Sequence, residues 1–274
     1  MLSPRTRALT LAIIAALCAC ISSSQVSAET LRIGGTGAAT EMLMRLGALF
    51  SAATKIELEV IPGLGSSGGI RAAADGALDI AVSGRRLTAD EKAKGLAEAG
   101  VLKTPFVIVT SLPKPAGMTS AEIVQAFGSE RKTWPDGSAI RVILRPKSDS
   151  DTTLLGEMFP NMAAAIETSR KRSDISTAAT DQDNVNIAEQ VPGSLTAATL
   201  LQILSERKNL RLVPIDGVEP SLANFESGTY KYVKELLFIA RAQKSQAAER
   251  FLAFLRSPET QKTIRDIGGR MTAN

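Results

Sequence analysis

Three short stretches gather small residues whose backbone N–H and hydroxyl groups could bind an anion. They are GGTGAAT (34–40), GLGSSGG (63–69) and RPKSDSDTT (145–153), here named the first, second and third turn. Each turn follows a predicted strand and precedes a predicted helix. The first turn of a helix has unpaired N–H groups and the positive end of the helix dipole. The turns could therefore hold an oxyanion, although the same residue types are also ordinary helix caps.

Arg145 stands at the start of the third turn, at the end of a predicted strand. Its guanidinium fork suits a tetrahedral oxyanion, because it offers parallel N–H donors and a fixed charge. Alone, such an arginine is most often a surface residue, and GSSGG alone is most often a linker. The combination of Arg145 with three turns in an alternating α/β chain is what favours an anion site.

Two patterns could indicate a nucleophilic serine, but one lacks the histidine base that it needs and the other lies where charged residues usually face solvent. Ser67 fits G-x-S-x-G, and SERK (205–208) fits S-x-x-K within a polar helix end. The chain contains no histidine, which excludes Ser-His-Asp catalysis and histidine-based zinc sites. Its two cysteines, Cys18 and Cys20, both lie near the N-terminus. We expect neither an enzyme nor a cofactor or metal site.

The composition predicts a globular protein that does not bind nucleic acid. The chain has 274 residues and 44% hydrophobic content, enough for one large or two small domains. Its net charge of +4 is small, its charges are interspersed, and aromatic residues make up 4%. The sequence therefore has neither a basic stripe nor a base-stacking surface.

The N-terminus predicts a secretory signal peptide, residues 1–28. Two arginines precede an apolar run (8–21), and small residues lead to a cleavage site after Ala28. Removal of this segment lowers the net charge from +4 to +2, because it contains two arginines and no acid. We expect a soluble, exported protein without disulfides. The alternative is a lipoprotein, since LCAC loosely fits a lipobox with Cys20 as the lipidated residue.

The hydrophobic periodicity of the first third predicts a parallel β-α-β-α-β unit with helices on both faces. Its predicted elements are a strand at 30–35, a helix at 38–54, a strand at 56–63, a helix ending near Gly76 and a strand at 77–84. Later segments predict strands at 102–115, 139–146, 210–217 and 229–240, and helices at 119–128, from 148, at 182–191, at 195–207 and near the C-terminus.

Irregular crossings near 109–116 and 210–217 suggest two lobes, each a mostly parallel sheet flanked by helices. We assign residues 29–110 plus 215–274 to lobe I and residues 111–214 to lobe II. Clefts between such lobes, at helix N-termini, are where α/β folds bind ligands.

The sequence resembles the periplasmic phosphate-binding proteins of bacterial ABC importers, which have the type II periplasmic-binding-protein fold. The resemblance covers nearly all of the chain after the signal peptide. It is carried by GLGSSGGIRAAADGALDIAVSGRRLTADE, MTSAEIVQAFGSERKTWPDG, LRPKSDSDTT, VPGSL, FESGTYKYVKELLFIA and AERFLAFLRSPETQKTIRDIG. Each stretch is weak alone, but together they are specific for this family.

The resemblance implies two lobes that close on a dehydrated oxyanion. Ser66 and Arg145 match ligand residues of the family, and Ser150 and Thr152 match a Ser-Gly-Thr triplet if one residue is inserted. Ala39 stands where the family has a ligand threonine, for which Thr36 or Thr40 could compensate. The full candidate set is Thr36, Gly37, Ala38, Ala39, Thr40, Ser66, Ser67, Ser83, Arg145, Ser150, Asp151 and Thr152.

One departure from the family concerns ligand identity. Gly84 follows Ser83, where well-known members have an aspartate that accepts a hydrogen bond from protonated phosphate. Either Asp151 supplies that acceptor from the opposite lobe, which we favour, or the ligand is another oxyanion such as sulfate, molybdate or tungstate. A further alternative is that Asp151 is only a helix cap pointing away.

The resemblance therefore predicts a monomeric periplasmic solute-binding protein that captures phosphate and delivers it to a membrane permease. The alternative from another class is an exported sensor or interaction protein on the same fold.

Overall fold

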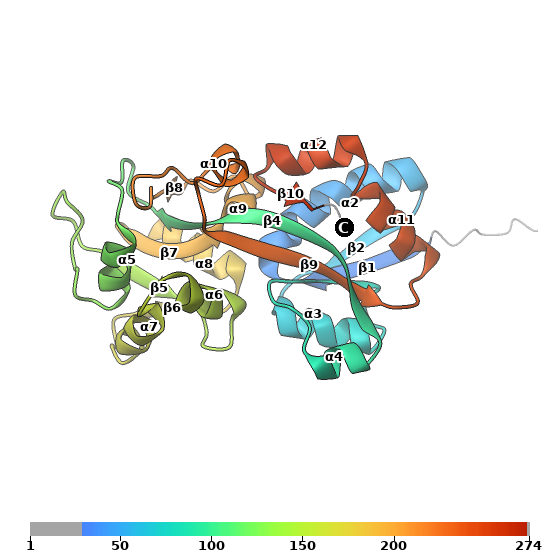
Figure 1. Ribbon diagram of the computed structural model, residues 1–274, viewed down its shortest axis with the longest axis horizontal. Coiled ribbons are helices and arrows are strands. Elements are labelled where there is room, and N and C mark those ends of the chain that lie inside the picture. The colour runs from blue at the N-terminus through green and yellow to red at the C-terminus, as the bar shows by residue number, and fades with distance from the viewer. Residues whose placement is uncertain (1–28, 273–274) are drawn as a thin grey trace, which may run out of the picture.

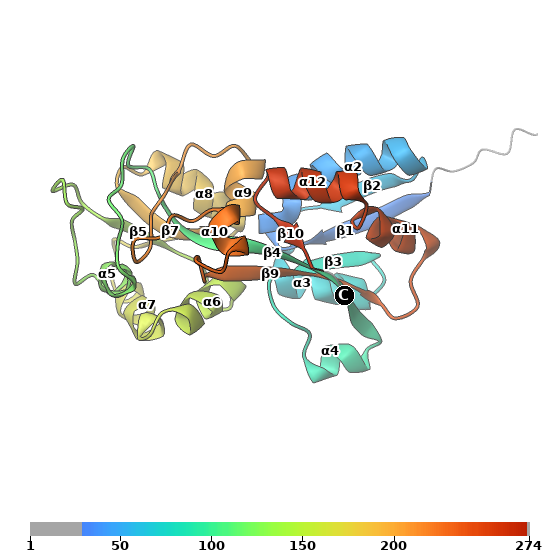
Figure 2. The same ribbon diagram turned by 45° about the horizontal axis from the view of Figure 1, so that its top comes forward.

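Residues 30–83 fold as the predicted β-α-β-α-β unit. Its elements are β1 (Thr30–Gly35), the 3₁₀ turn η1 (Gly37–Ala39), α2 (Thr40–Thr54), β2 (Glu57–Ile61), α3 (Gly65–Ala74) and β3 (Ile80–Ser83). Strand β1 pairs in parallel with both β2 and β3. Helix α2 lies on one face of these strands and α3 on the other (Figures 1 and 2). The parallel unit with helices on both faces is confirmed.

The computed structural model describes residues 29–272, in which two long strands connect two α/β lobes. These strands are β4 (Leu96–Thr110) and β9 (Val233–Arg241), which pair antiparallel and run side by side through the middle of the molecule (Figure 1). The sheet order is β2-β1-β3-β9-β4-β7-β5-β6. The ladders that join β9 to β3 and β4 to β7 are antiparallel, whereas the outer ladders are parallel. The predicted α/β class is confirmed, with a mixed rather than uniformly parallel sheet.

The remaining elements complete the two lobes. The second lobe contains α5 (Ser120–Phe127), β5 (Arg141–Leu144), α6 (Ser150–Met158), α7 (Met162–Arg170), β6 (Ser176–Thr177), α8 (Asp181–Gln190), β7 (Ser194–Thr199), α9 (Leu200–Ser205) and β8 (Arg211–Leu212). The others are α4 (Ala89–Ala93), α10 (Leu222–Glu226), α11 (Gln246–Phe254), α12 (Pro258–Asp266) and β10 (Arg270–Met271). Thr119 and Glu122 form the capping box predicted at the start of α5.

One predicted helix was wrong in its first half. The stretch 195–207 was expected to be helical, but β7 runs to Thr199 and only Leu200–Ser205 is α-helix. Every residue of β7 is buried, because the strand lies between β4 and β5. Strand β7 continues directly into α9 without a turn between them, so its short alternation was read as part of one helical stretch.

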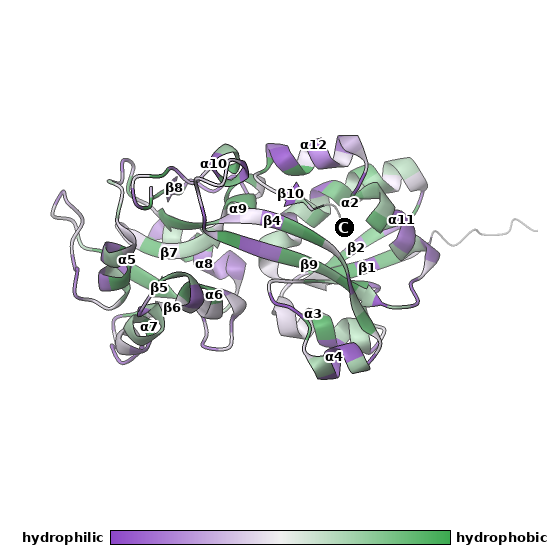
Figure 3. Ribbon diagram, in the orientation of Figure 1, coloured by the Kyte–Doolittle hydropathy of each residue, from purple (hydrophilic) through white to green (hydrophobic). Residues whose placement is uncertain are grey.

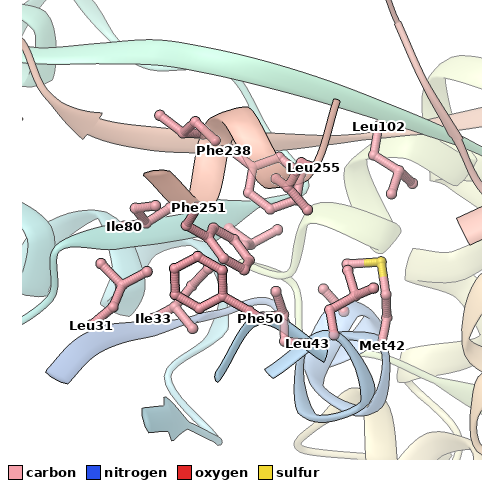
Figure 4. Close-up of a cluster of buried hydrophobic side chains, with 14 of the residues drawn as sticks. Leu31, Ile33, Met42, Leu43, Phe50, Ile80, Leu102, Phe238, Phe251 and Leu255 are labelled. Carbon is pink, nitrogen blue, oxygen red and sulfur yellow. The ribbon is translucent and has the colours of Figure 1, made fainter. Parts of the chain in front are cut away.

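Each lobe has its own hydrophobic core. In the first lobe Phe50 of α2 meets Phe251 of α11 edge-on, with ring centroids 5.2 Å apart (Figure 4). The second lobe packs around Trp134, whose indole N–H donates to the carbonyl of Gly193 at 3.1 Å. Strand β4 contributes to both cores, with Leu102 in the first and Phe106 in the second. The assignment of lobe boundaries to residues 110 and 215 stays a prediction.

The predicted signal peptide, residues 1–28 with Cys20, lies outside the described residues. Within residues 29–272, the helices are too short or too polar to cross a membrane. Hydrophobic residues concentrate in the sheet and on the inner faces of the helices, whereas a hydrophilic band crosses β9 near its start (Figure 3).

Candidate anion-binding site

A cavity of about 260 Å³ lies between the lobes, and residues from all three turns line it. The first two turns belong to the first lobe and the third turn to the second, so the cavity is closed only by both lobes together. Its walls also contain the start of α8 and two arginines. The lining residues are Thr36, Leu64, Gly65, Ser66, Ser67, Gly68, Arg71, Arg85, Pro146, Ser148, Asp149, Ser150, Ala179 and Asp181.

The first turn is held tightly against the neighbouring strand β3. Gly35 has a φ of +134°, and a Cβ at that position would lie 2.0 Å from the carbonyl oxygen of Val82. Only glycine permits this approach. The backbone N–H of Thr36 then donates to the same carbonyl at 2.8 Å. Thr36 is buried and lines the cavity, while the backbone of Gly37, Ala38, Ala39 and Thr40 forms the turn behind it.

The second turn supplies two hydroxyl groups at the start of α3. The Ser66 hydroxyl accepts a hydrogen bond from the backbone N–H of Gly84 at 2.9 Å. The Ser67 hydroxyl accepts two bonds from the guanidinium of Arg85, at 3.2 and 3.1 Å. Arg85 also pairs with Glu91 at 2.7 Å, and this hydrogen bond lowers the pKa of Glu91 to about 2. The second turn is therefore fastened to the segment that follows β3.

Arg145 is buried, with 6% of its surface exposed, and lies behind the residues that line the cavity rather than among them. Its Nη1 donates to the carbonyl of Ala178 at 2.8 Å, and its Nη2 lies 2.7 Å from Asp149 and 3.6 Å from Asp181. The buried Nε of Arg145 has no hydrogen-bond partner within the described residues. The Nε atoms of Arg131 and Arg170 share this property, so it does not by itself distinguish Arg145.

Asp151 forms a buried ion pair with Lys234 of β9, and the two side chains are 4% and 1% exposed. Burial raises the pKa of Asp151 to about 6, although the charge of Lys234 opposes this shift. Burial also disfavours the charge of Lys234, but Asp151, Asp181 and Asp149 outweigh that effect and raise its pKa. Asp151 is absent from the cavity lining, so its role as a hydrogen-bond acceptor for the ligand stays a prediction.

Lys234 also fills the space beside Gly84. A Cβ at residue 84 would lie 2.8 Å from Cε and 3.3 Å from Nζ of Lys234, and 2.9 Å from the hydroxyl of Ser150. A larger side chain at 84 would therefore need Lys234 to move.

The structure brings only some of the predicted residues into the cavity wall. Thr36, Ser66, Ser67 and Ser150 line it, and the buried Arg145 lies next to its carboxylates. Two other predicted residues make local hydrogen bonds instead. Ser83 bonds the backbone of Arg85, and Thr152 donates to the carbonyl of Pro146 at 2.9 Å.

Sequence reasoning missed five charged residues: Arg71, Arg85, Asp149 and Asp181, which line the cavity, and Lys234, which pairs with Asp151 beside it. The spacing of Asp149, four residues after Arg145, was a usable signal for an ion pair. Asp181 follows the N-cap residue Thr180, and an acidic residue in the first turn of a helix normally only stabilises the helix, so the sequence contained no sign of a site. Lys234 lies within an otherwise apolar strand, and such an isolated charge could have indicated a buried pair.

The family model for the PBP superfamily domain matches residues 22–259. The chain belongs to the PBP superfamily. No curated protein matches its sequence. Solved structures show that its fold is shared by binding proteins.

Three solved structures illustrate the likeness. A Clostridium perfringens protein named as a phosphate ABC transporter substrate-binding protein, with bound phosphate, has a TM-score of 0.75 at 17% identity, covering 89% of this chain and 100% of that one. A Vibrio cholerae ABC-type phosphate transport receptor has a TM-score of 0.61 at 18% identity, covering 88% and 100%. The Azotobacter vinelandii periplasmic molybdate-binding protein has a TM-score of 0.57 at 12% identity, covering 89% and 99%. At these identities the likeness concerns the fold.

Proposed function

We propose that this protein binds phosphate between its two lobes and, as an exported monomer, delivers it to the permease of an ABC importer. One observation carries the proposal. Hydroxyl groups from three helix starts in both lobes line one cavity, and the buried guanidinium of Arg145 pairs with Asp149 and Asp181, two carboxylates that line it. The names of the structural relatives, which include phosphate and molybdate binders, support the same ligand class.

The donors are sufficient for useful affinity. Hydrogen bonds to a charged group contribute about 1.5–3 kcal/mol each, so three or four of them give micromolar or tighter binding. Thr36, Ser66 and Ser150 supply hydroxyl groups that can rotate toward an oxygen of the ligand. Helix starts at the second and third turns add the positive ends of two helix dipoles.

A carboxylate in the wall supports phosphate over anions that carry no proton. Asp149 lines the cavity, and its carboxylate can accept a hydrogen bond from hydrogen phosphate while repelling sulfate. A second candidate is a proton-free oxyanion such as sulfate, molybdate or tungstate. Gly84 supports this candidate, because phosphate-binding proteins that the sequence resembles have an aspartate at this position as the acceptor for the phosphate proton.

Calorimetric titration of the purified exported protein with phosphate, sulfate, molybdate and tungstate tests the proposal. We expect phosphate to bind with micromolar or tighter affinity and at least 100-fold more tightly than sulfate. Tighter binding of a proton-free anion would favour the second candidate, and heat from none of the four would contradict oxyanion binding. Loss of phosphate uptake on gene deletion would separate transport from a sensing role.

A further inference from the structure

The carboxylate of Asp181 already binds the donors that the first turn offers to a ligand. Its Oδ2 accepts a hydrogen bond from the backbone N–H of Ala38 at 3.1 Å and from the hydroxyl of Thr36 at 3.3 Å. Its Oδ1 lies 3.6 Å from Nη2 of Arg145. Asp181 is 7% exposed and belongs to the second lobe, whereas Thr36 and Ala38 belong to the first. One carboxylate therefore connects the lobes at the position proposed for the anion.

The surroundings fix Asp181 in this position. Its backbone carbonyl accepts a hydrogen bond from the Gln202 side chain at 3.1 Å. The next residue, Gln182, donates to the carbonyl of Gly37 at 2.8 Å. A Cβ at Gly37 would lie 2.8 Å from the Asp181 carboxylate and 2.4 Å from the Gln182 side chain. The start of α8 is thus hydrogen-bonded to the first turn, and glycine at 37 leaves room for the side chains of Asp181 and Gln182.

The charges around Arg145 show which contact an incoming anion must replace. Asp149 holds Nη2 of Arg145 at 2.7 Å and also caps α6 by accepting from the backbone N–H of Asp151. Asp181 makes the longer contact with Arg145 and occupies the donors of the first turn. A dianion entering beside both carboxylates would be repelled by each, and such repulsion is weakly screened in a buried site. Asp181 is therefore the group that has to withdraw.

We propose that Asp181 is a built-in competitor: its carboxylate occupies the anion position in the free protein and lowers the affinity for phosphate. This inference rests on the proposed function. It assigns to Asp181 the opposite effect from that of a residue that binds the ligand, because its removal tightens binding. The Asp181 carboxylate also connects the two lobes when no ligand is bound, because it accepts hydrogen bonds from Thr36 and Ala38 of the first lobe.

Titrations of inorganic phosphate and sulfate into wild type, Asp181→Asn and Asp181→Ala test the competitor. Both variants are expected to bind phosphate at least tenfold more tightly than wild type. The matched control is Asp183→Asn, which removes the same charge from the same helix turn at an exposed residue without contact to the first turn. Its phosphate affinity is expected to stay within twofold of wild type.

Three results would overturn the proposal. An unchanged phosphate affinity in both Asp181 variants would show that phosphate does not displace the Asp181 carboxylate. Equally tighter phosphate binding by Asp183→Asn would show that the gain comes from the change in net charge and not from the position of Asp181. Weaker phosphate binding with unchanged sulfate binding would make Asp181 an acceptor for the phosphate proton instead.

A ligand-free measurement separates this inference from the proposed function. Amide hydrogen exchange at Ala38 is expected to be at least tenfold faster in Asp181→Ala than in wild type, because the N–H loses its acceptor. Equal exchange rates would overturn the competitor contact itself. Absence of phosphate binding in wild type and in all variants would overturn the proposed function, and the competitor with it, whatever the exchange rates show.

Discussion

Replacing Lys234 by methionine is expected to destabilise the protein by about 3–5 kcal/mol at pH 7.5. The substitution leaves the carboxylate of Asp151 buried without its cation, and breaking a buried ion pair on one side typically costs this much. The matched control is Lys103→Met, which removes a lysine from a half-exposed pair with Glu235. A surface pair of this kind contributes about 1 kcal/mol or less.

The cost of Lys234→Met should also depend on pH. A folded-state pKa of about 6 means that the penalty for burying the Asp151 charge is present above pH 6 and is relieved as pH falls. In the variant the pKa of Asp151 lies higher than in wild type, because the opposing charge of Lys234 is gone, so the variant is protonated over a pH range in which the wild-type carboxylate is still charged. At about 1.4 kcal/mol for each pH unit of that range, the difference between wild type and variant should shrink by as much as about 2 kcal/mol on lowering the pH from 7.5 to 5.

Urea unfolding followed by circular dichroism at pH 7.5 and pH 5 measures both effects. The double variant with Asp151→Leu and Lys234→Met should recover most of the lost stability, since replacing both partners by apolar groups is often neutral. A loss below about 1 kcal/mol for Lys234→Met at pH 7.5, or a loss independent of pH, would refute the description of this pair as buried and coupled.

Three further substitutions test other parts of the account. Arg145→Met should weaken phosphate binding at least 100-fold in calorimetry, whereas Arg172→Met at an exposed ion pair should leave it unchanged; equal effects would exclude a special role for Arg145. Gly35→Ala should lower the free energy of unfolding in urea by about 3 kcal/mol or more, because the added Cβ would clash with a carbonyl oxygen of the neighbouring strand. The control Gly63→Ala should lower it by about 1 kcal/mol, because the φ of Gly63 is positive but no atom lies near its Cβ position. Similar losses for both variants would contradict the close contact between Gly35 and β3. Glu91 has a pKa of about 2, so its stabilising effect is present above pH 4.5 and is lost as the pH falls toward 2. In thermal unfolding, wild type should be more stable than Glu91→Gln by about 1 kcal/mol or less at pH 7, and the two proteins should be equally stable at pH 2. A stability difference that grows with acidity would be inconsistent with the pairing of Glu91 and Arg85.

The sequence predicted the parts of the fold whose periodicity is local. The unit from β1 to β3 and the helix α5 could be predicted because their signals lie within a few residues of each other, for example the capping box of Thr119 and Glu122. Strand β7 was missed because it is short and continues directly into α9, so that the two elements look like one helix.

The candidate site was predictable only where one stretch of chain carries the signal. Small residues at helix starts and Arg145 could be recognised, because their chemistry lies in their own neighbourhood. Asp181 lies 145 residues from Thr36, and Lys234 lies 83 residues from Asp151. Such contacts depend on how the two lobes pack against each other, and the spacing of residues in one sequence gives no information on this packing.

The most direct test of the central claim is a crystal structure of the protein with bound arsenate, which has the shape and the proton of phosphate and scatters anomalously. We predict one anomalous peak in the cavity between the lobes, within hydrogen-bond distance of Thr36, Ser66 and Arg145. A peak outside that cavity, or one without contact to Arg145, would contradict the proposed site.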